Sequence, residues 1–225
     1  MQAVILSAGK GVRLRPITNS IPKALIAVNG KPLLQRILEA LPDEVDEIII
    51  VVGYLADQIT QRFGNTWNGR PIRYVVQDPL TGTGGALHLA KDFLRDRFLV
   101  INGDDLYAKA DLERLIAHPF GILLLRTDAL IRTSALVDEQ GRFEGLEEKA
   151  PAQETKLRVC GAYVMDERFF KYPLTEIQVG GHREWGLPQT LIRVTGDIDV
   201  RAEYATSWMP VGTPDELDRA RKMTS

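Results

Sequence analysis

Short apolar runs alternate with amphipathic segments over the first hundred residues of the chain. The apolar runs, which are rich in β-branched residues and typical of buried strands, cover residues 4–6, 47–52, 72–77 and 97–101. The segments between them carry apolar side chains at helical spacing over residues 31–41, 55–63 and 84–94. This alternation predicts an α/β fold with right-handed crossovers: a Rossmann-like open mixed sheet, mostly parallel, with helices on both faces.

The pattern changes after residue 108. A short helix is predicted over residues 112–116, and strands are predicted over residues 122–126, 134–137, 143–146 and 158–165. We expect this half to form a mixed sheet that folds over the ligand crevice. Because no internal repeat, low-complexity tract or linker interrupts the chain, we predict a single domain over residues 1–225, with halves at 1–108 and 109–225.

Polar or glycine-rich residues follow three of the predicted strands. They begin at Ala8 after the first strand, at Gln77 after the third and at Asn102 after the fourth. In open α/β sheets ligands bind beyond the carboxyl ends of the strands. The three loops are therefore expected to converge on one crevice.

The first of these loops has the composition of an anion site. Ala8, Gly9 and Gly11 are small enough for the backbone to turn tightly and present N–H groups, and the cations Arg13, Arg15 and Lys23 follow. The spacing fits neither a dinucleotide-binding G-x-G-x-x-G fingerprint, because position 14 is leucine, nor a P-loop. The stretch predicts a site for a polyphosphate.

Composition narrows the possible partners. The chain has 225 residues, is 44% apolar and carries a net charge of −2 with both signs interspersed, which fits one core and favours neither nucleic-acid nor membrane binding. It shows no signal-peptide pattern and no apolar stretch of about 20 residues, so we expect a cytoplasmic protein. The single cysteine, Cys160, excludes a disulfide within the chain and favours a buried hydrophobic role.

The first two dozen residues also match a known motif. Gly9, Gly11, Arg13, Leu14, Pro16 and Thr18, followed by Pro22 and Lys23, resemble the G-x-G-x-R-(L/M)-x-P-x-T and P-K motif that opens the sugar-1-phosphate nucleotidyltransferases, the pyrophosphorylases that make nucleotide sugars. The resemblance extends over nearly the whole chain. It implies a glycosyltransferase-A-like fold that transfers a nucleotide from a nucleoside triphosphate to a sugar 1-phosphate and releases pyrophosphate.

The resemblance assigns the nucleotide to residues 1–108. Arg13 is expected to hold the triphosphate and Lys23 to stabilise charge on the reacting α-phosphate, so both are candidate catalytic residues. The amide of Gln77 offers a donor and an acceptor to an imide edge, and glycines beside it let backbone stack on the base, which favours UTP or dTTP although guanine presents a similar edge. The candidate nucleotide-binding residues are Leu6, Ala8, Gly9, Gly11, Gln77, Gly82 and Thr83.

The resemblance assigns the sugar phosphate to residues 109–225. Lys149 would pair with its phosphate, and Glu148 would accept hydrogen bonds from the hydroxyl groups. Gly161 would let the backbone approach the sugar. Glu184 resembles a Glu-x-x-Leu helix start that also contacts sugar hydroxyls, although a glutamate is common in a first helical turn.

The expected cofactor is Mg²⁺, with Asp104 as its ligand. Family members usually carry a second metal-binding aspartate before Val-Gly-Thr, but here Pro210 stands at that position. Three outcomes stay open: Asp104, phosphate oxygens and water hold the metal; another acid such as Asp105 substitutes; or catalysis is weakened. The following Thr213-Pro-Asp-Glu216 is a capping box that predicts a last, structural helix.

Two other functions stay open beside nucleotidyl transfer to a sugar. One is a catalytically weakened regulatory protein that binds nucleotide sugars, and the other is a nucleotidyltransferase with a non-sugar phosphate acceptor. His88, His118 and His182 lack partners at metal-ligand spacing and are expected to be structural or exposed. The motifs do not indicate an oligomeric state.

Overall fold

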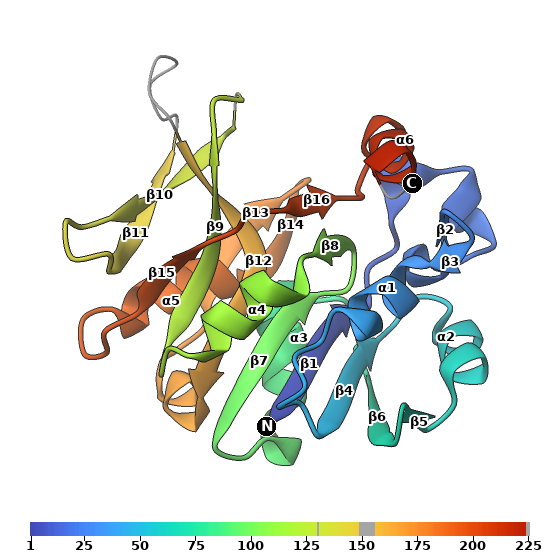
Figure 1. Ribbon diagram of the computed structural model, residues 1–225, viewed down its shortest axis with the longest axis horizontal. Coiled ribbons are helices and arrows are strands. Elements are labelled where there is room, and N and C mark those ends of the chain that lie inside the picture. The colour runs from blue at the N-terminus through green and yellow to red at the C-terminus, as the bar shows by residue number, and fades with distance from the viewer. Residues whose placement is uncertain (130, 149–155, 224–225) are drawn as a thin grey trace.

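The chain begins with a buried strand at the centre of the molecule (Figure 1). The structure is a computed structural model that describes residues 1–129, 131–148 and 156–223. The helices are α1 (Leu33–Glu39), α2 (Ala56–Phe63), α3 (Gly82–Leu89), α4 (Lys109–Ile116), α5 (Leu187–Val194) and α6 (Pro214–Met223). The strands are β1 (Gln2–Ser7), β2 (Ala27–Val28), β3 (Lys31–Pro32), β4 (Glu47–Val52), β5 (Thr66–Trp67), β6 (Arg70–Val76), β7 (Arg97–Asn102), β8 (Asp105–Tyr107), β9 (Gly121–Thr127), β10 (Thr133–Val137), β11 (Phe143–Glu148), β12 (Lys156–Asp166), β13 (Thr175–Val179), β14 (His182–Gly186), β15 (Arg201–Tyr204) and β16 (Trp208–Pro210).

The central sheet is mostly parallel, as predicted. Within the described residues it has eight strands in the order β15-β9-β12-β7-β1-β4-β6-β5. Strands β7, β1, β4 and β6 run parallel, with Ile5 of β1 level with Ile50 of β4 and Ile101 of β7. Strand β12 enters antiparallel between β7 and β9, which makes the sheet mixed.

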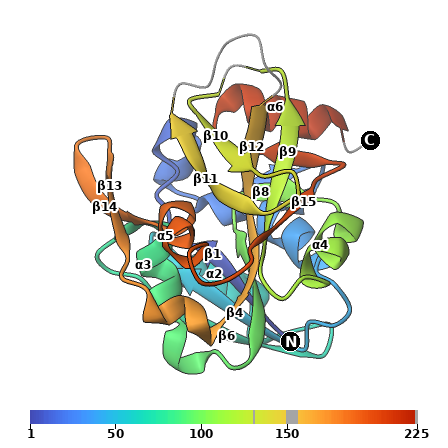
Figure 2. The ribbon, with the colours of Figure 1, turned by 90° about the vertical axis from the view of Figure 1, so that its left-hand side faces the viewer.

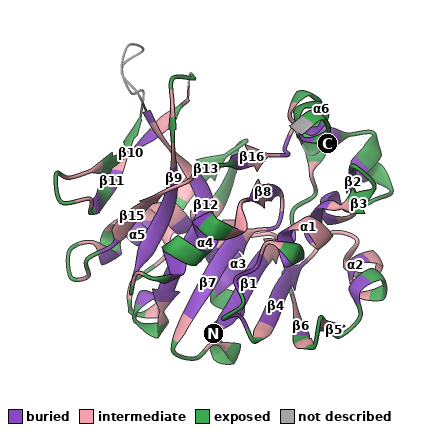
Figure 3. Cartoon of the chain, viewed as in Figure 1, coloured by how far each residue is buried: buried purple, intermediate pink, exposed green. Residues whose placement is uncertain are grey.

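Alternate residues of each central strand serve two cores. Ala3 and Ile5 pack into the core that contains the buried faces of α1, α2 and α4, whereas Val4 packs with α3 and α5 on the opposite side. Figure 2 shows α3 and α5 on one side of the sheet and α4 on the other, and Figure 3 shows the central strands buried. Continuous apolar runs form here because a sheet covered on both faces has no solvated side. No helix among the described residues is long and apolar enough to cross a bilayer.

The second half departs from the sequence-based expectation. It does not fold over the crevice as a sheet of its own, because β12, β9 and β15 extend the central sheet. Ala162 and Val164 complete one core, and Tyr163 and Met165 complete the other, which explains this placement. Among the described strands of this half, the hairpins β10–β11 and β13–β14 lie outside the sheet, as does β16, which pairs with β8. The sequence analysis did not predict β13, β14, β15, β8 or β16.

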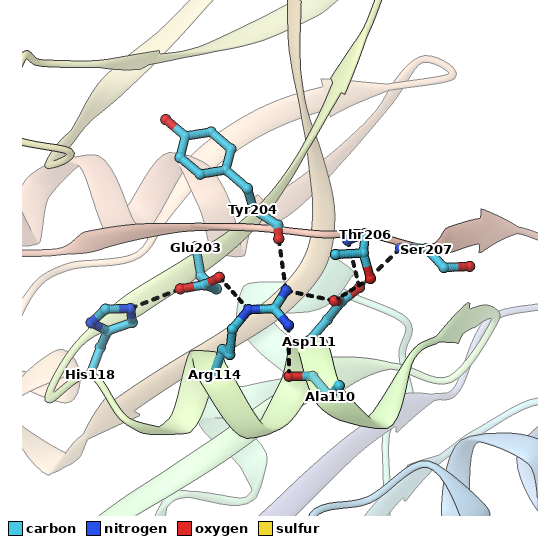
Figure 4. Close-up of polar contacts among 8 residues, drawn as sticks. All are labelled: Ala110, Asp111, Arg114, His118, Glu203, Tyr204, Thr206 and Ser207. Atoms are coloured by element: carbon cyan, nitrogen blue, oxygen red, sulfur yellow. Dashed lines mark hydrogen bonds and ion pairs between the residues drawn. The ribbon is translucent and has the colours of Figure 1, made fainter.

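A buried carboxylate fixes the path of the chain between β15 and β16. Asp111 of α4 is fully buried, and its Oδ2 accepts hydrogen bonds from the backbone N–H groups of Thr206 and Ser207 at 2.9 and 3.1 Å. Its Oδ1 accepts from the Thr206 hydroxyl and from Arg114, both at 2.7 Å (Figure 4). Arg114 in turn donates to Glu203 at 2.9 Å. The network ties α4 to the segment that leads into β16.

The same network sets how Asp111 responds to acid. Burial alone would raise the pKa of Asp111, but the hydrogen bonds from Thr206, Ser207 and Arg114 outweigh it and lower the pKa. Because the folded state has the lower pKa, the carboxylate stabilises the fold fully above the unfolded pKa of about 3.9, and this stabilisation is lost as the pH falls below that value.

We expect Asp111→Ala to lower the free energy of unfolding at pH 7 by about 3 kcal/mol, because it leaves buried backbone donors and Arg114 without their acceptor. Urea unfolding measures the loss, which should shrink as the pH falls below about 4. Asp218→Ala, at an exposed aspartate of α6, is the control. Equal destabilisation by the two substitutions would contradict the role given to Asp111.

Candidate active site

A cleft of about 950 Å³ lies beyond the carboxyl ends of the parallel strands, where the sequence placed it. The three loops that follow β1, β6 and β7 meet there. The predicted site residues that line it are Leu6, Ala8, Gly9, Gly11, Arg13, Lys23, Gln77, Gly82, Thr83, Asp104 and Glu184. The structure thus brings together most of the residues that the sequence selected.

The glycine loop after β1 is closed by its own downstream residues. Gly11 has a φ of +60°, and a Cβ there would lie 3.0 Å from the Thr18 side chain and 3.3 Å from Lys23 Cβ. Thr18 also donates a hydrogen bond to the Gly11 carbonyl at 2.9 Å. A Cβ on Gly9, by contrast, would meet nothing within 4 Å. The loop is therefore packed behind Gly11 and open at Gly9, where it faces the cleft.

Lys23 and Asp104 form an ion pair inside the cleft. Lys23 Nζ lies 2.5 Å from Asp104 Oδ2, with 10% of the lysine side chain exposed and 41% of the aspartate. The lysine is thus withdrawn into the wall, whereas the aspartate is accessible from the cleft. Oδ2 of Asp104, the candidate metal ligand, is therefore in contact with the ammonium of Lys23, the candidate catalytic cation.

Other cations of the cleft are unpaired. Lys10, Arg13 and Arg15 line it, and none of the three makes an ion pair with a described residue. Gly212 leaves room for Arg13, because a Cβ at Gly212 would lie 2.7 Å from the Arg13 guanidinium. The cleft therefore carries free positive charge, as a polyphosphate site requires.

The capping box beside Gly212 is formed in part. Thr213 accepts from the Glu216 N–H at 3.3 Å, as expected, but Glu216 accepts from the Gly212 N–H at 2.8 Å rather than from that of Thr213. The cap of α6 thus fixes the glycine against which Arg13 lies.

The structure shows what stands near Asp104 in place of a second metal-binding aspartate. Pro210 lies on β16 opposite Asp105, and the Val211 N–H donates to the Asp104 carbonyl at 3.2 Å. The side chain of Asp105 is buried, and burial together with the charge of Asp104 raises its pKa well above the usual range. Among the described residues no group of three or more acidic, histidine or cysteine side chains could hold a metal.

A single carboxylate nevertheless fits the expected cofactor. Mg²⁺ is commonly held by one or two carboxylates together with substrate phosphates and water. Asp104 is accessible in a cleft that also carries unpaired cations suited to phosphates. The residues present therefore fit a Mg²⁺ ion that arrives with a phosphate ligand rather than one held by the protein alone.

Gln77 is oriented by its own loop. Its Nε2 donates to Thr81 Oγ1 at 3.0 Å and to the Gly82 carbonyl at 3.1 Å, so both amide hydrogens are engaged and Oε1 stays available as an acceptor. The glycines of this loop pack against β14: a Cβ on Gly82, whose φ is +84°, would lie 2.8 Å from the Trp185 carbonyl. Packing of the hairpin therefore requires glycine at 82, independently of any stacking on a base.

Glu184 reaches the cleft from a strand, which corrects the sequence-based expectation of a helix start. It lies on β14 opposite Ile177, and α5 begins only at Leu187, where the N–H donates to Thr83 Oγ1 at 3.1 Å. Helix formation is delayed because Trp185 pairs with Thr81 through a 2.8 Å backbone hydrogen bond.

The tip of the β13–β14 hairpin lines the cleft with Val179, Gly180 and His182, which the sequence analysis did not select. Figure 2 shows the hairpin projecting from the body of the molecule. Two adjacent glycines between short apolar-containing runs are a hairpin signal that could have identified it. Ser7, at the end of β1, also lines the cleft and was missed. Asn102, at the end of β7, lines it as the convergence of the loops predicted, although it was not selected as a site residue.

The predicted sugar-binding residues are less closely grouped. Glu148 lies at the exposed end of β11, outside the cleft lining, and Lys149 falls outside the described residues. Gly161 does not line the cleft either. Its φ is +68°, and a Cβ there would lie 2.1 Å from Asn102 Nδ2, so the glycine makes room for Asn102.

Comparison with known proteins gives a consistent picture. A family model described as nucleotidyl transferase matches residues 2–119. The bifunctional protein GlmU of Methanocaldococcus jannaschii is 33% identical over 225 residues, which cover 99% of this chain and 54% of that protein. The UTP–glucose-1-phosphate uridylyltransferase AglF of Haloferax volcanii is 28% identical over 235 residues, covering 99% and 96%. The chain therefore spans about half the length of the GlmU relative.

A solved structure agrees with the fold. The crystal structure of a putative glucose-1-phosphate thymidylyltransferase from Bacillus anthracis superposes with a TM-score of 0.85 at 25% identity, and the match covers 99% of this chain and 94% of that one.

We expect Gly161→Ala to destabilise the protein by about 3 kcal/mol, because it combines a left-handed backbone with a methyl group forced onto Asn102. Thermal and urea unfolding provide the measurement. Gly145→Ala is the matched control, since Gly145 also lies in a strand and a Cβ there meets nothing within 4 Å. A Gly161→Ala protein as stable as the control would disprove the packing described.

Proposed function

This chain belongs to the nucleotidyl transferase family, and from that premise we propose that it joins a nucleoside triphosphate to a sugar 1-phosphate, forming a nucleotide sugar and pyrophosphate. One observation carries the proposal: a single cleft holds an open glycine turn, unpaired cations and an accessible carboxylate. Nucleotidyl transfer needs these groups, since enzymes catalyse such reactions chiefly by positioning the reactants and neutralising phosphate charge.

In the proposed reaction a phosphate oxygen of the sugar 1-phosphate attacks the α-phosphorus in line. The bond to the oxygen that bridges to the β-phosphorus breaks, and pyrophosphate leaves with the electron pair. The attacking oxygen is already an anion, so no protein base and no covalent intermediate are required. Arg13 and the backbone N–H groups from Gly9 to Gly11 hold the triphosphate, and Lys23 stabilises the charge that develops at the α-phosphate.

We propose that Asp104 carries Mg²⁺ when the nucleotide is bound. The ion would neutralise phosphate charge and orient the triphosphate. Because Lys23 occupies Asp104 Oδ2 in the free protein, this role requires the lysine to exchange Asp104 for the α-phosphate. The ion pair thereby keeps both charges satisfied until the substrate replaces it.

The orientation of Gln77 supports a choice of base. Its free Oε1 accepts a hydrogen bond from the ring N–H of uracil, thymine or guanine, whereas cytosine and adenine present an acceptor at that position. We propose UTP or dTTP as the nucleotide. The relatives whose names specify a uridylyl or thymidylyl transfer to glucose 1-phosphate agree with this choice.

We propose that the sugar phosphate binds on the side of the cleft that is lined by the second half of the chain. Glu184 is the predicted sugar ligand that lines the cleft, and Glu148, Lys149 and Gly161 keep the roles that the resemblance implies. Since nucleoside triphosphates are cytoplasmic metabolites, we propose a cytoplasmic enzyme.

Pro210 favours a second candidate function. With no carboxylate at that position and Asp105 buried, the cleft offers Asp104 as its metal ligand next to the phosphate-binding cations. A protein that binds a nucleotide sugar but transfers slowly, acting as a regulatory subunit, is consistent with this arrangement.

Pyrophosphate release from a panel of sugar 1-phosphates and non-sugar phosphates with UTP, dTTP, GTP and CTP decides among these functions. We expect turnover with a sugar 1-phosphate, at least about tenfold faster with UTP or dTTP than with CTP, since one unpaired acceptor costs on the order of 1–3 kcal/mol. Tight nucleotide-sugar binding without release under any condition would favour the regulatory protein, and release with non-sugar acceptors alone would favour the other alternative.

Lys23→Ala separates the two proposed roles of this lysine. Turnover should fall by about 10² to 10³, as when a preorganised charge-stabilising group is removed. Binding of Mn²⁺ to the nucleotide-free protein, measured by electron paramagnetic resonance, should become tighter because Asp104 loses its competing ammonium. Lys31→Ala, which removes an exposed ion pair with Glu39, is the control. Near-normal turnover would refute the catalytic role, and unchanged Mn²⁺ affinity would refute the competition.

A further inference from the structure

The first turn of the last helix lies beside the cation of the glycine loop. Leu217 and Ala220 of α6 are buried in the same cluster as Leu14, the residue that follows Arg13. Gly212, just before the helix, lines the cleft together with Arg13, whereas Glu216 does not line it. The helix therefore stands next to a candidate triphosphate ligand, on the side away from the cleft.

Glu216 and Arg13 meet at Gly212. Glu216 Oε2 accepts a hydrogen bond from the Gly212 N–H at 2.8 Å. A Cβ at Gly212 would lie 2.7 Å from Arg13 Nη2 and 3.1 Å from Glu216 Oε2, so both atoms border the same point. The carboxylate and the guanidinium are therefore within about 6 Å of each other, a range over which opposite charges attract appreciably.

This attraction acts without a direct contact between the two groups. No ion pair or hydrogen bond among the described residues joins Glu216 to Arg13. The guanidinium thus keeps its N–H donors for phosphate oxygens, to which arginine binds in a fixed, forked geometry. The side chain of Arg13 is otherwise exposed, and a long exposed side chain loses rotamer entropy when a ligand fixes it. A charge that restricts Arg13 beforehand reduces this cost.

We propose that Glu216 is a positioning residue for the triphosphate, because its charge holds the Arg13 guanidinium against Gly212, ready to receive phosphate oxygens. The inference rests on the proposed function, which supplies the triphosphate. It gives α6 a part in substrate binding, beyond the structural role that its capping box predicts.

The negative charge of Glu216 also repels the phosphates, and the two effects oppose each other. The repulsion is the weaker effect because Glu216 lies outside the cleft lining and Arg13 stands within it. Coulomb energy falls with distance, so Glu216 acts more strongly on the adjacent guanidinium than on phosphates beyond it. Removal of this charge should therefore weaken triphosphate binding.

Glu216→Gln removes the charge and keeps a side-chain oxygen that can accept from the Gly212 N–H. The probes are the α,β-methylene analogues of UTP and GTP, titrated by calorimetry into the full chain with Mg²⁺. The analogue that binds tighter to the unaltered protein should bind about three- to tenfold more weakly to Glu216→Gln. The unfolding midpoint should stay within about 2 °C, because the cap of α6 is retained.

Asp215→Asn is the matched control. Asp215 is the other acid in the first turn of α6, so it shares the favourable interaction with the helix N-terminus, but it is exposed and makes no hydrogen bond to Gly212. Its substitution removes the same charge one residue away and should change the affinity by less than about twofold.

Arg13→Gln tests whether the two side chains act together. In this background Glu216→Gln should no longer weaken binding, since the group that the carboxylate positions is gone. A cap with a purely structural role would give the same loss with and without Arg13.

Four results would overturn the proposal: unchanged or tighter binding by Glu216→Gln, equal weakening by Asp215→Asn, the same loss in the Arg13→Gln background, or no binding of either analogue by the unaltered protein. Failure of the proposed function has a different signature. It appears as absence of pyrophosphate release with every acceptor in a protein that binds the analogue and still shows the coupling between Glu216 and Arg13.

Discussion

The ion pair between Lys23 and Asp104 is the contact on which the active-site cleft depends. The two residues are 81 positions apart in sequence, and they meet because β1 and β7 are parallel neighbours whose following loops leave the same edge of the sheet. The lysine needs this partner because its side chain is nearly buried, and an unpaired buried ammonium carries a large desolvation cost. The pair satisfies both groups while leaving them where an incoming phosphate and its metal can replace the contact.

Glycines allow the surrounding segments to approach closely enough for this arrangement. Gly103 leaves the space that Ser7 Oγ occupies, since a Cβ there would lie 1.8 Å from that atom. Gly161 makes room for Asn102, and Gly212 makes room for Arg13. Among the motif glycines discussed, Gly9 has open space in front of it. Several glycines near the cleft are thus required by packing. This packing holds the functional side chains in place.

The sequence was sufficient to predict the parallel strands β7, β1, β4 and β6 of the central sheet and most of the cleft. The runs at 47–52 and 97–101 are buried on both faces, so their pattern has one interpretation, and the loops after them follow from the parallel topology. The hairpin β13–β14 was harder to predict from the sequence than these strands, because its residues are largely exposed and show no continuous apolar face. Glu184 was assigned to a helix start because Glu-x-x-Leu resembles one in the family, whereas pairing of Trp185 with Thr81 keeps the backbone extended.

The positive charges of the cleft are of two kinds, one paired and the others unpaired. In the cleft, Lys23 is neutralised by Asp104 and Arg13 stands free beside the open glycine turn, which suits a ligand that brings both phosphate and metal. A net charge of −2 over the whole chain hides this arrangement, because recognition depends on where unpaired charges stand and not on their sum.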